Sequence, residues 1–195
     1  MTTSRLEAFS DGVIAILITI MVLELHVPDG AGLRDFAPAM PHLLIYALSF
    51  VFLGIYWNNH HHLLQAARTV SGAILWANLH LLFWLSLVPF TTAYMGLNGF
   101  AALPTAVYGI NLLLAAAAYT ILQSYITTHH GEVSPLKHAV GNDRKGKASV
   151  ALYIAGVAVA WWYPSVALAF YSAVALLWLV PDKRIELALV DGGSA

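Results

Sequence analysis

The sequence predicts an all-α fold, an integral membrane bundle of six transmembrane helices. Of the 195 residues, 59% are hydrophobic and 10% are charged, against about 25% charged in an ordinary soluble domain. With a mean hydropathy of +0.73, the apolar surface exceeds what one soluble core can bury, so the surplus must face lipid. Long charge-free runs and a one-sided distribution of basic residues support the same prediction.

A helix needs about 20 apolar residues to cross the roughly 30 Å hydrocarbon layer, so charge-free runs place the spans. The first helix, at about 6–25, is unusual because its uncharged centre between Asp11 and Glu24 is short. The uncharged run 36–67 holds the second helix.

The later helices follow from two longer uncharged runs. The run 69–131 has room for two spans, divided at the turn dipeptide Asn98-Gly99. The run 148–181 is too long for one span at 1.5 Å per residue, and Pro164 behind three aromatic residues predicts a tight hairpin. The six predicted helices occupy about 6–25, 42–62, 70–95, 104–127, 148–162 and 165–181.

Basic residues predict the orientation. Eight of the nine Lys and Arg residues fall at the N-terminus, in the loop between the second and third helices, in the loop 128–147 and in the tail 182–195. Only Arg34 lies on the opposite side. Because cytoplasmic loops are enriched in Lys and Arg, we expect a multi-pass protein of the cell (inner) membrane with both termini cytoplasmic. The chain has no internal repeat, so a symmetric pore would need several chains.

The first helix has the most unusual chemistry, with Arg5, Ser10 and Asp11 at its start and Glu24 at its end. One interpretation is structural: Ser10 or Asp11 caps the helix and Arg5 orients the chain. The other is that this helix is sheltered from lipid, because ionisable residues at membrane depth usually face a bundle interior or water.

An aliphatic stripe runs along the same helix at spacings i, i+3, i+4 and i+7. It consists of Ile16, Thr19, Ile20 and Leu23. The stripe is either ordinary bundle core or the lining of a pore, in which bulky aliphatic side chains form a constriction. The spacing alone leaves both interpretations open.

The second helix ends in Trp57 followed by a triple histidine, His60 to His62. Imidazole is a common metal ligand, but successive helical residues point about 100° apart, so the three rings cannot converge on one ion. We therefore expect no metal site, and expect Trp57 and His60 to form hydrogen bonds inside the bundle. The sequence has no GxSxG, HExxH or Gly-rich phosphate motif, which argues against an enzyme.

Two motifs carry a family resemblance. The segment Arg5-Leu6-Glu7-Ala8-Phe9-Ser10-Asp11 resembles the R-x-x-x-F-S-D motif that begins the first helix in the transmembrane protein 175 family of potassium channels. Trp57-Asn58-Asn59-His60 is similar to the W-x-x-H that ends the second helix of that family. One departure is His62, where the animal members have arginine. The chain is identified as a single-repeat bacterial member.

The resemblance implies a homotetrameric channel that passes K⁺ passively through a pore lined by the first helix, without a TVGYG filter, and leaves proton permeability open. It implies that Ile16 forms the narrowest constriction, Thr19 the pore threonine and Leu23 a further apolar ring, with Ile20 on the same stripe. The motif residues would form a polar network that holds this helix. These residues are Arg5, Phe9, Ser10, Asp11, Trp57 and His60.

Asp11 and Glu24 would lie near the two pore mouths and raise the local cation concentration. The rival function is a proton-coupled secondary transporter with a relay of His60, His80 and Asp11. Neither function requires a cofactor or a nucleic-acid partner, so we expect the lipid bilayer, further copies of the chain and permeant monovalent cations as the only partners.

Overall fold

A computed structural model of the chain describes residues 2–65, 67, 69–129 and 143–179, and these residues contain helices and turns but no strand. The all-α prediction is confirmed for this part of the chain. The helices are α1 (Thr3–Ile20), η1 (Met21–Glu24), α2 (Leu33–Phe36), η2 (Ala37–Ala39), α3 (Met40–Gln65), α4 (Gly72–Ser86), α5 (Val88–Leu97), α6 (Ala102–His129), α8 (Arg144–Val159) and α9 (Pro164–Leu179).

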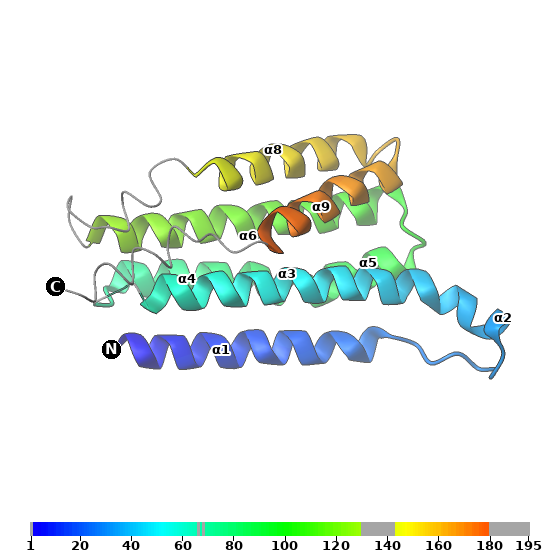
Figure 1. The fold of residues 1–195 in the computed structure, drawn as a ribbon, viewed down its shortest axis with the longest axis horizontal. Helices are drawn as coiled ribbons and strands as arrows, with labels where there is room; N and C mark the ends of the chain where they lie inside the picture. The colour runs from blue at the N-terminus through cyan, green and yellow to red at the C-terminus, as the bar shows by residue number, and fades with distance from the viewer. Residues whose placement is uncertain (1, 66, 68, 130–142, 180–195) are drawn as a thin grey trace.

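The long helices lie side by side along the longest axis of the molecule (Figure 1). Helices α4 and α5 follow one another along a single span, and consecutive spans run in opposite directions. Helix α1 lies at one edge of the bundle, where it packs against α3 and α4. At the other edge, α8 and α9 pack against each other and against α6. Since α1 is covered from one side only, much of its surface stays open.

Among the described residues, four segments are long and apolar enough to cross a membrane, as expected for a multi-pass membrane protein. They are Thr3–Glu24, Leu33–Gln65, Gly72–Leu97 and Ala102–Thr128. The other two, α8 and α9, have 16 described residues each, and the last two residues of the predicted helix 165–181 lie outside the described part. Their hairpin turns just before Pro164, which suits a helix start because its missing N–H would be unpaired there anyway.

Two of the differences from the predicted helix boundaries have a clear physical cause. The predicted helix 70–95 is divided between α4 and α5, because Pro89 has no N–H to donate to the carbonyl one turn earlier. Helix α8 begins at Arg144 instead of residue 148, because the Asp143 side chain caps it by accepting a hydrogen bond from the Gly146 N–H at 2.8 Å. The end of the predicted loop 128–147 is therefore helical. Most of that loop and the tail 182–195 lie outside the described residues.

The turn between α5 and α6 uses the predicted Asn98-Gly99 dipeptide. Gly99 and Phe100 both have a φ of +58°, the left-handed region that favours glycine. The Phe100 N–H donates to the Met95 carbonyl at 3.0 Å, the bond expected where a helix ends in this conformation. Asn98-Gly99 thus reverses the chain between two antiparallel helices.

The apolar core has two parts. The first joins α1, α3, α4 and α6, and α1 with η1 contributes to it Leu6, Ile14, Leu17 and Met21. The second joins α3, α5, α6, α8 and α9 around the buried rings of Tyr108, Tyr153 and Tyr171. The α8–α9 hairpin is therefore attached to the rest of the chain by aromatic packing, while α1 belongs to a separate cluster.

The second core depends on glycines that leave room for Tyr171. A Cβ at Gly156 or Gly109 would overlap the Tyr171 ring, which is fully buried and cannot turn aside. We expect Gly156→Ala to lower the melting temperature in detergent, although alanine favours a helix by about 1 kcal/mol over glycine. The matched control is Gly54→Ala, where a Cβ meets nothing within 4 Å, so its melting temperature should stay equal or rise. Equal shifts in both variants would contradict this account of the packing.

Candidate functional site

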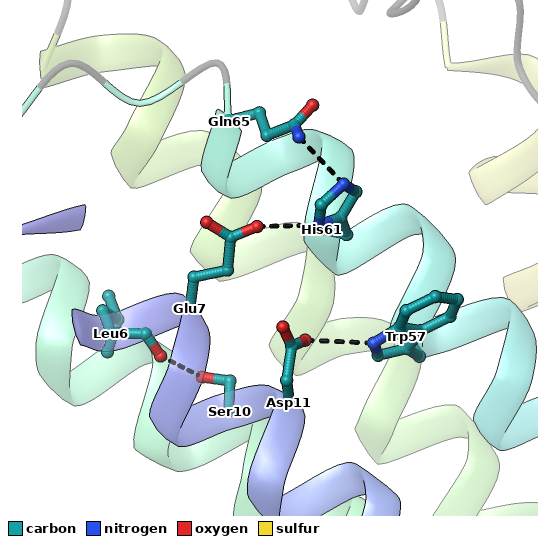
Figure 2. A network of polar contacts seen from close by, with 7 residues as sticks. All are labelled: Leu6, Glu7, Ser10, Asp11, Trp57, His61 and Gln65. Carbon is teal, nitrogen blue, oxygen red and sulfur yellow. Dashed lines mark hydrogen bonds and ion pairs between the residues drawn. The ribbon is translucent and has the colours of Figure 1, made fainter. Parts of the chain in front are cut away.

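Polar side chains join the start of α1 to the end of α3. Trp57 Nε1 donates a hydrogen bond to Asp11 Oδ1 at 3.0 Å, and His61 Nδ1 lies 2.7 Å from Glu7 Oε1 (Figure 2). Glu7 and Asp11 are one turn apart on α1, as Trp57 and His61 are on α3. Because the two helices run antiparallel, moving one turn forward along α1, from Glu7 to Asp11, corresponds to moving one turn backward along α3, from His61 to Trp57. The two pairs therefore fix the register between the helices.

A second set of contacts lies deeper and includes α4. Asn78 Nδ2 donates to Ser10 Oγ at 3.0 Å, and Asn78 Oδ1 lies 2.7 Å from His60 Nε2. All three side chains are completely buried. The amide oxygen can only accept, so His60 Nε2 carries the proton. Ser10 Oγ in turn donates to the Leu6 carbonyl at 2.8 Å. One asparagine thus links α1, α3 and α4.

These contacts decide which side of α1 faces the bundle. Leu6, Ser10, Ile14 and Leu17 are buried, and at its N-terminal end Thr3 Oγ1 donates to the Ala67 carbonyl at 3.2 Å. Rotation of α1 about its own axis would remove Ser10 from Asn78 and Asp11 from Trp57. The buried polar groups left without partners would make that rotation costly.

The aliphatic stripe lies on the open side of α1. Ile16 is 57% exposed and Leu23 78%, and Thr19 and Ile20 are exposed as well. A Cβ at Gly12, on the same side, would meet nothing within 4 Å. The stripe is therefore not part of the core of its own chain, and this face of α1 is available to something outside it.

The other predicted site residues differ in their surroundings. Arg5 and Phe9 are exposed, and in the described part of the chain the Arg5 guanidinium forms no ion pair. Asp11 is half-buried and directed to Trp57, so its carboxylate faces α3 instead of lying on the exposed stripe. Glu24 is exposed in η1, at the far end of the same segment.

The sequence motifs do not include Glu7, His61 and Asn78, which the structure places in these contacts. A signal for two of them was present: Glu7, Ser10 and Asp11 have the spacing i, i+3, i+4, and the same spacing relates Trp57, His60 and His61. Two helices with matching polar spacings can pair in antiparallel register. Asn78 has no comparable signal, because its importance comes from the position of α4.

The relay of His60, His80 and Asp11 that the rival transporter hypothesis requires is not joined by hydrogen bonds among the described residues. His80 Nε2 accepts from Trp84 Nε1 on the same helix at 2.9 Å. His60 and Asp11 have different partners, Asn78 and Trp57. His60 forms its hydrogen bond inside the bundle, with α4, whereas the exposed Trp57 donates to α1 at the surface.

Known proteins resemble this chain, two of them along more than nine tenths of its length. A family model described as the endosomal/lysosomal potassium channel TMEM175 matches residues 5–89. A potassium channel of Chryseobacterium sp. (strain P1-3) is 54% identical over 191 residues, which cover 98% of this chain and 100% of that protein. The crystal structure of a lysosomal potassium-selective channel TMEM175 homolog from Chamaesiphon minutus has a TM-score of 0.76 and 25% identity, covering 92% of this chain and 97% of that one.

The apolar helices and these matches define a multi-pass membrane protein of a channel class. The chain belongs to the TMEM175 family. The human endosomal/lysosomal proton channel TMEM175 is a more distant relative, 31% identical over 116 residues that cover 53% of this chain and 23% of the human protein.

If Asn78 holds α1 against α3 and α4, removing its side chain should destabilise the protein. Asn78→Ala leaves the buried His60 Nε2–H without a hydrogen-bond partner, at a cost of about 1–3 kcal/mol. It also removes the donor to Ser10 Oγ, whose hydroxyl still donates to the Leu6 carbonyl. We expect the melting temperature in detergent to fall by roughly 4–8 °C for a net loss of about 2 kcal/mol. Asn58→Ala is the matched control, a half-buried asparagine of α3. Equal stability of the two variants would show that Asn78 does not hold α1.

Proposed function

We propose that the chain is a potassium-permeable channel that conducts passively, formed by four copies whose α1 helices surround a central pore. The observation that carries this proposal is the asymmetry of α1: one side is held by buried polar contacts, and the other presents an exposed aliphatic stripe. A helix that packs against its own chain on one side only can line, with its other side, a central pore formed by several copies of the chain.

Several features support the individual roles. The stripe would form the constriction, with Ile16 at its narrowest ring, Thr19 and Ile20 along the path and Leu23 as a further ring. Thr19 Oγ1 donates to the Ile16 carbonyl at 2.9 Å within α1, which leaves its lone pairs free to face a passing cation. Glu24 would attract cations at one mouth. Asp11 would contribute mainly by holding α1 to Trp57.

The membrane arrangement is part of the proposal. Six spans, with α8 and α9 as the last two, place both termini on one side, which the basic residues favour as the cytoplasmic side of the inner membrane. A proton-coupled transporter is not favoured, because the relatives are channels and the three relay residues do not bond to one another. Proton permeability is compatible with this pore.

Electrical recording of the purified protein in a planar bilayer tests the function. With potassium on one side of the bilayer and sodium on the other, a passive channel gives single-channel currents without any coupling ion. The reversal potential should differ from zero, with the sign expected for a channel that prefers K⁺ over Na⁺. A protein that moves K⁺ only when a proton gradient is applied would support the transporter instead.

Ile16 provides the sharpest test of the pore. A ring of isoleucines offers no oxygen ligands, so selectivity must come from pore size and from the lower cost of partly dehydrating K⁺ than Na⁺. We expect Ile16→Asn to give larger currents and to move the reversal potential toward zero, because amide dipoles relieve dewetting. Ile154→Asn on α8 is the matched control, with 54% exposure against 57% for Ile16. If only the control changed the current, α1 would not line the pore.

Assembly can be tested by crosslinking, because the chain has no cysteine of its own. Leu23→Cys places a single thiol on the most exposed part of the stripe, and we expect oxidation to join chains into covalent dimers. Leu176→Cys on α9, which is 66% exposed, should crosslink much less because it lies at the opposite edge of the bundle. A wild-type protein that runs as a monodisperse monomer in mild detergent would contradict the tetramer.

A further inference from the structure

Three potential metal ligands meet where α1 and α3 are joined. Glu7 and Asp11 of α1 and His61 of α3 each offer one ligand atom, and these atoms lie within 4.8 Å of one another. Figure 2 shows both carboxylates directed toward α3, with the His61 ring facing Glu7. The group is half-buried, so an ion from solution can reach it. Neither the channel function nor the family motif uses Glu7 or His61.

In the described part of the chain, no fixed positive charge balances this cluster. Two carboxylates one turn apart on the same helix repel each other. The carboxylate of Glu7 is paired with His61, whose ring is charged only when protonated, and that of Asp11 accepts from the neutral Trp57 indole. Among the described residues, no lysine or arginine forms an ion pair with either acid. A bound cation would remove this repulsion.

The ligand types indicate which cation. Imidazole nitrogen together with carboxylate oxygen is a typical set for Zn²⁺ and similar divalent transition metals, whereas Ca²⁺ and Mg²⁺ prefer oxygen ligands alone. His60 takes no part, because its ring is buried against Asn78. The difficulty of three consecutive histidines on one helix does not arise, since a single histidine acts with two acids from another helix.

Two of the three ligands, Asp11 and His61, each have a further polar partner close by. Trp57 holds one oxygen of Asp11, which leaves the other free, and Gln65 lies 2.8 Å from His61 Nε2. A metal on His61 Nδ1 requires the proton to be on Nε2. In the structure the Gln65 amide nitrogen faces Nε2, so the amide must turn its oxygen toward the ring to accept a hydrogen bond from that N–H. Ligand atoms about 2.0–2.2 Å from a tetrahedral Zn²⁺ lie about 3.4 Å apart. The 2.7 Å separation of His61 Nδ1 and Glu7 Oε1 must therefore widen slightly, and any wider separation in the group, up to 4.8 Å, must contract.

We propose that Glu7, Asp11 and His61 bind one divalent transition-metal ion of the Zn²⁺ type, which clamps the start of α1 to α3. The metal site itself is independent of the channel activity. Its effect rests on the proposed function: if α1 lines the pore, an ion that ties α1 to α3 restricts the movement of the pore helix and lowers the current. The metal-free expectation from the triple histidine is thereby revised for this one cluster.

Binding is tested first, without any current. The full-length protein, purified without a histidine tag and treated with chelator, is titrated with ZnCl₂ by calorimetry, and the metal retained after gel filtration is measured by mass spectrometry. We expect about one Zn²⁺ per chain. His61→Gln and Glu7→Gln should each weaken binding at least tenfold. His62→Gln, the neighbouring half-buried histidine outside the cluster, should bind like the wild type.

The possible results separate the site from its effect. Failure to bind Zn²⁺ more tightly than about 1 mM, or equal losses in His61→Gln and His62→Gln, would overturn the site. In bilayers, micromolar ZnCl₂ should reduce the wild-type current, and His61→Gln should lose this inhibition while His62→Gln keeps it. Zn²⁺ binding to a protein whose current does not respond would overturn the clamp alone. A protein that binds Zn²⁺ but never conducts would instead contradict the proposed function.

Discussion

Asn78 holds the arrangement of α1, α3 and α4 because its amide donates to one helix and accepts from another. Ser10 and His60 are completely buried, so neither can exchange its protein partner for water. In such surroundings an unpaired polar group is costly, which makes one rotational setting of α1 preferred over the others. The pairs Asp11–Trp57 and Glu7–His61, which lie nearer the surface, then fix the register of α1 against α3.

This arrangement explains why α1 can differ on its two sides. Since a few polar contacts near its start already decide its rotation, the helix does not need apolar packing all round. Its open face can carry residues selected for another purpose, here an aliphatic stripe with one threonine. The short apolar centre between Asp11 and Glu24, unusual for a helix surrounded by lipid, suits a helix placed between the bundle and a water-filled path.

The contacts that hold α1 are also the natural place to control it. The α8–α9 hairpin belongs to a separate core around Tyr171, so changes there should affect stability more than the position of α1. At the α1–α3 contact, by contrast, an added charge or ion acts directly on the helix with the exposed stripe. Glu7 occupies an unspecified position of the first motif, and His61 directly follows the second.

The sequence by itself determined the helical class, the membrane setting, the approximate helices and the face of α1 that carries the stripe. These depend on composition, run length and the 3.6-residue period, all of which are local properties of the chain. The motif Arg5 to Asp11 also indicated the family. Tertiary structure alone decided that the stripe is exposed, that Asn78 joins Ser10 to His60, that Arg5 has no ion-pair partner among the described residues, and that His61 meets two acids. Each of these depends on which residues of different helices come together, and periodicity within one helix carries no information about its neighbours.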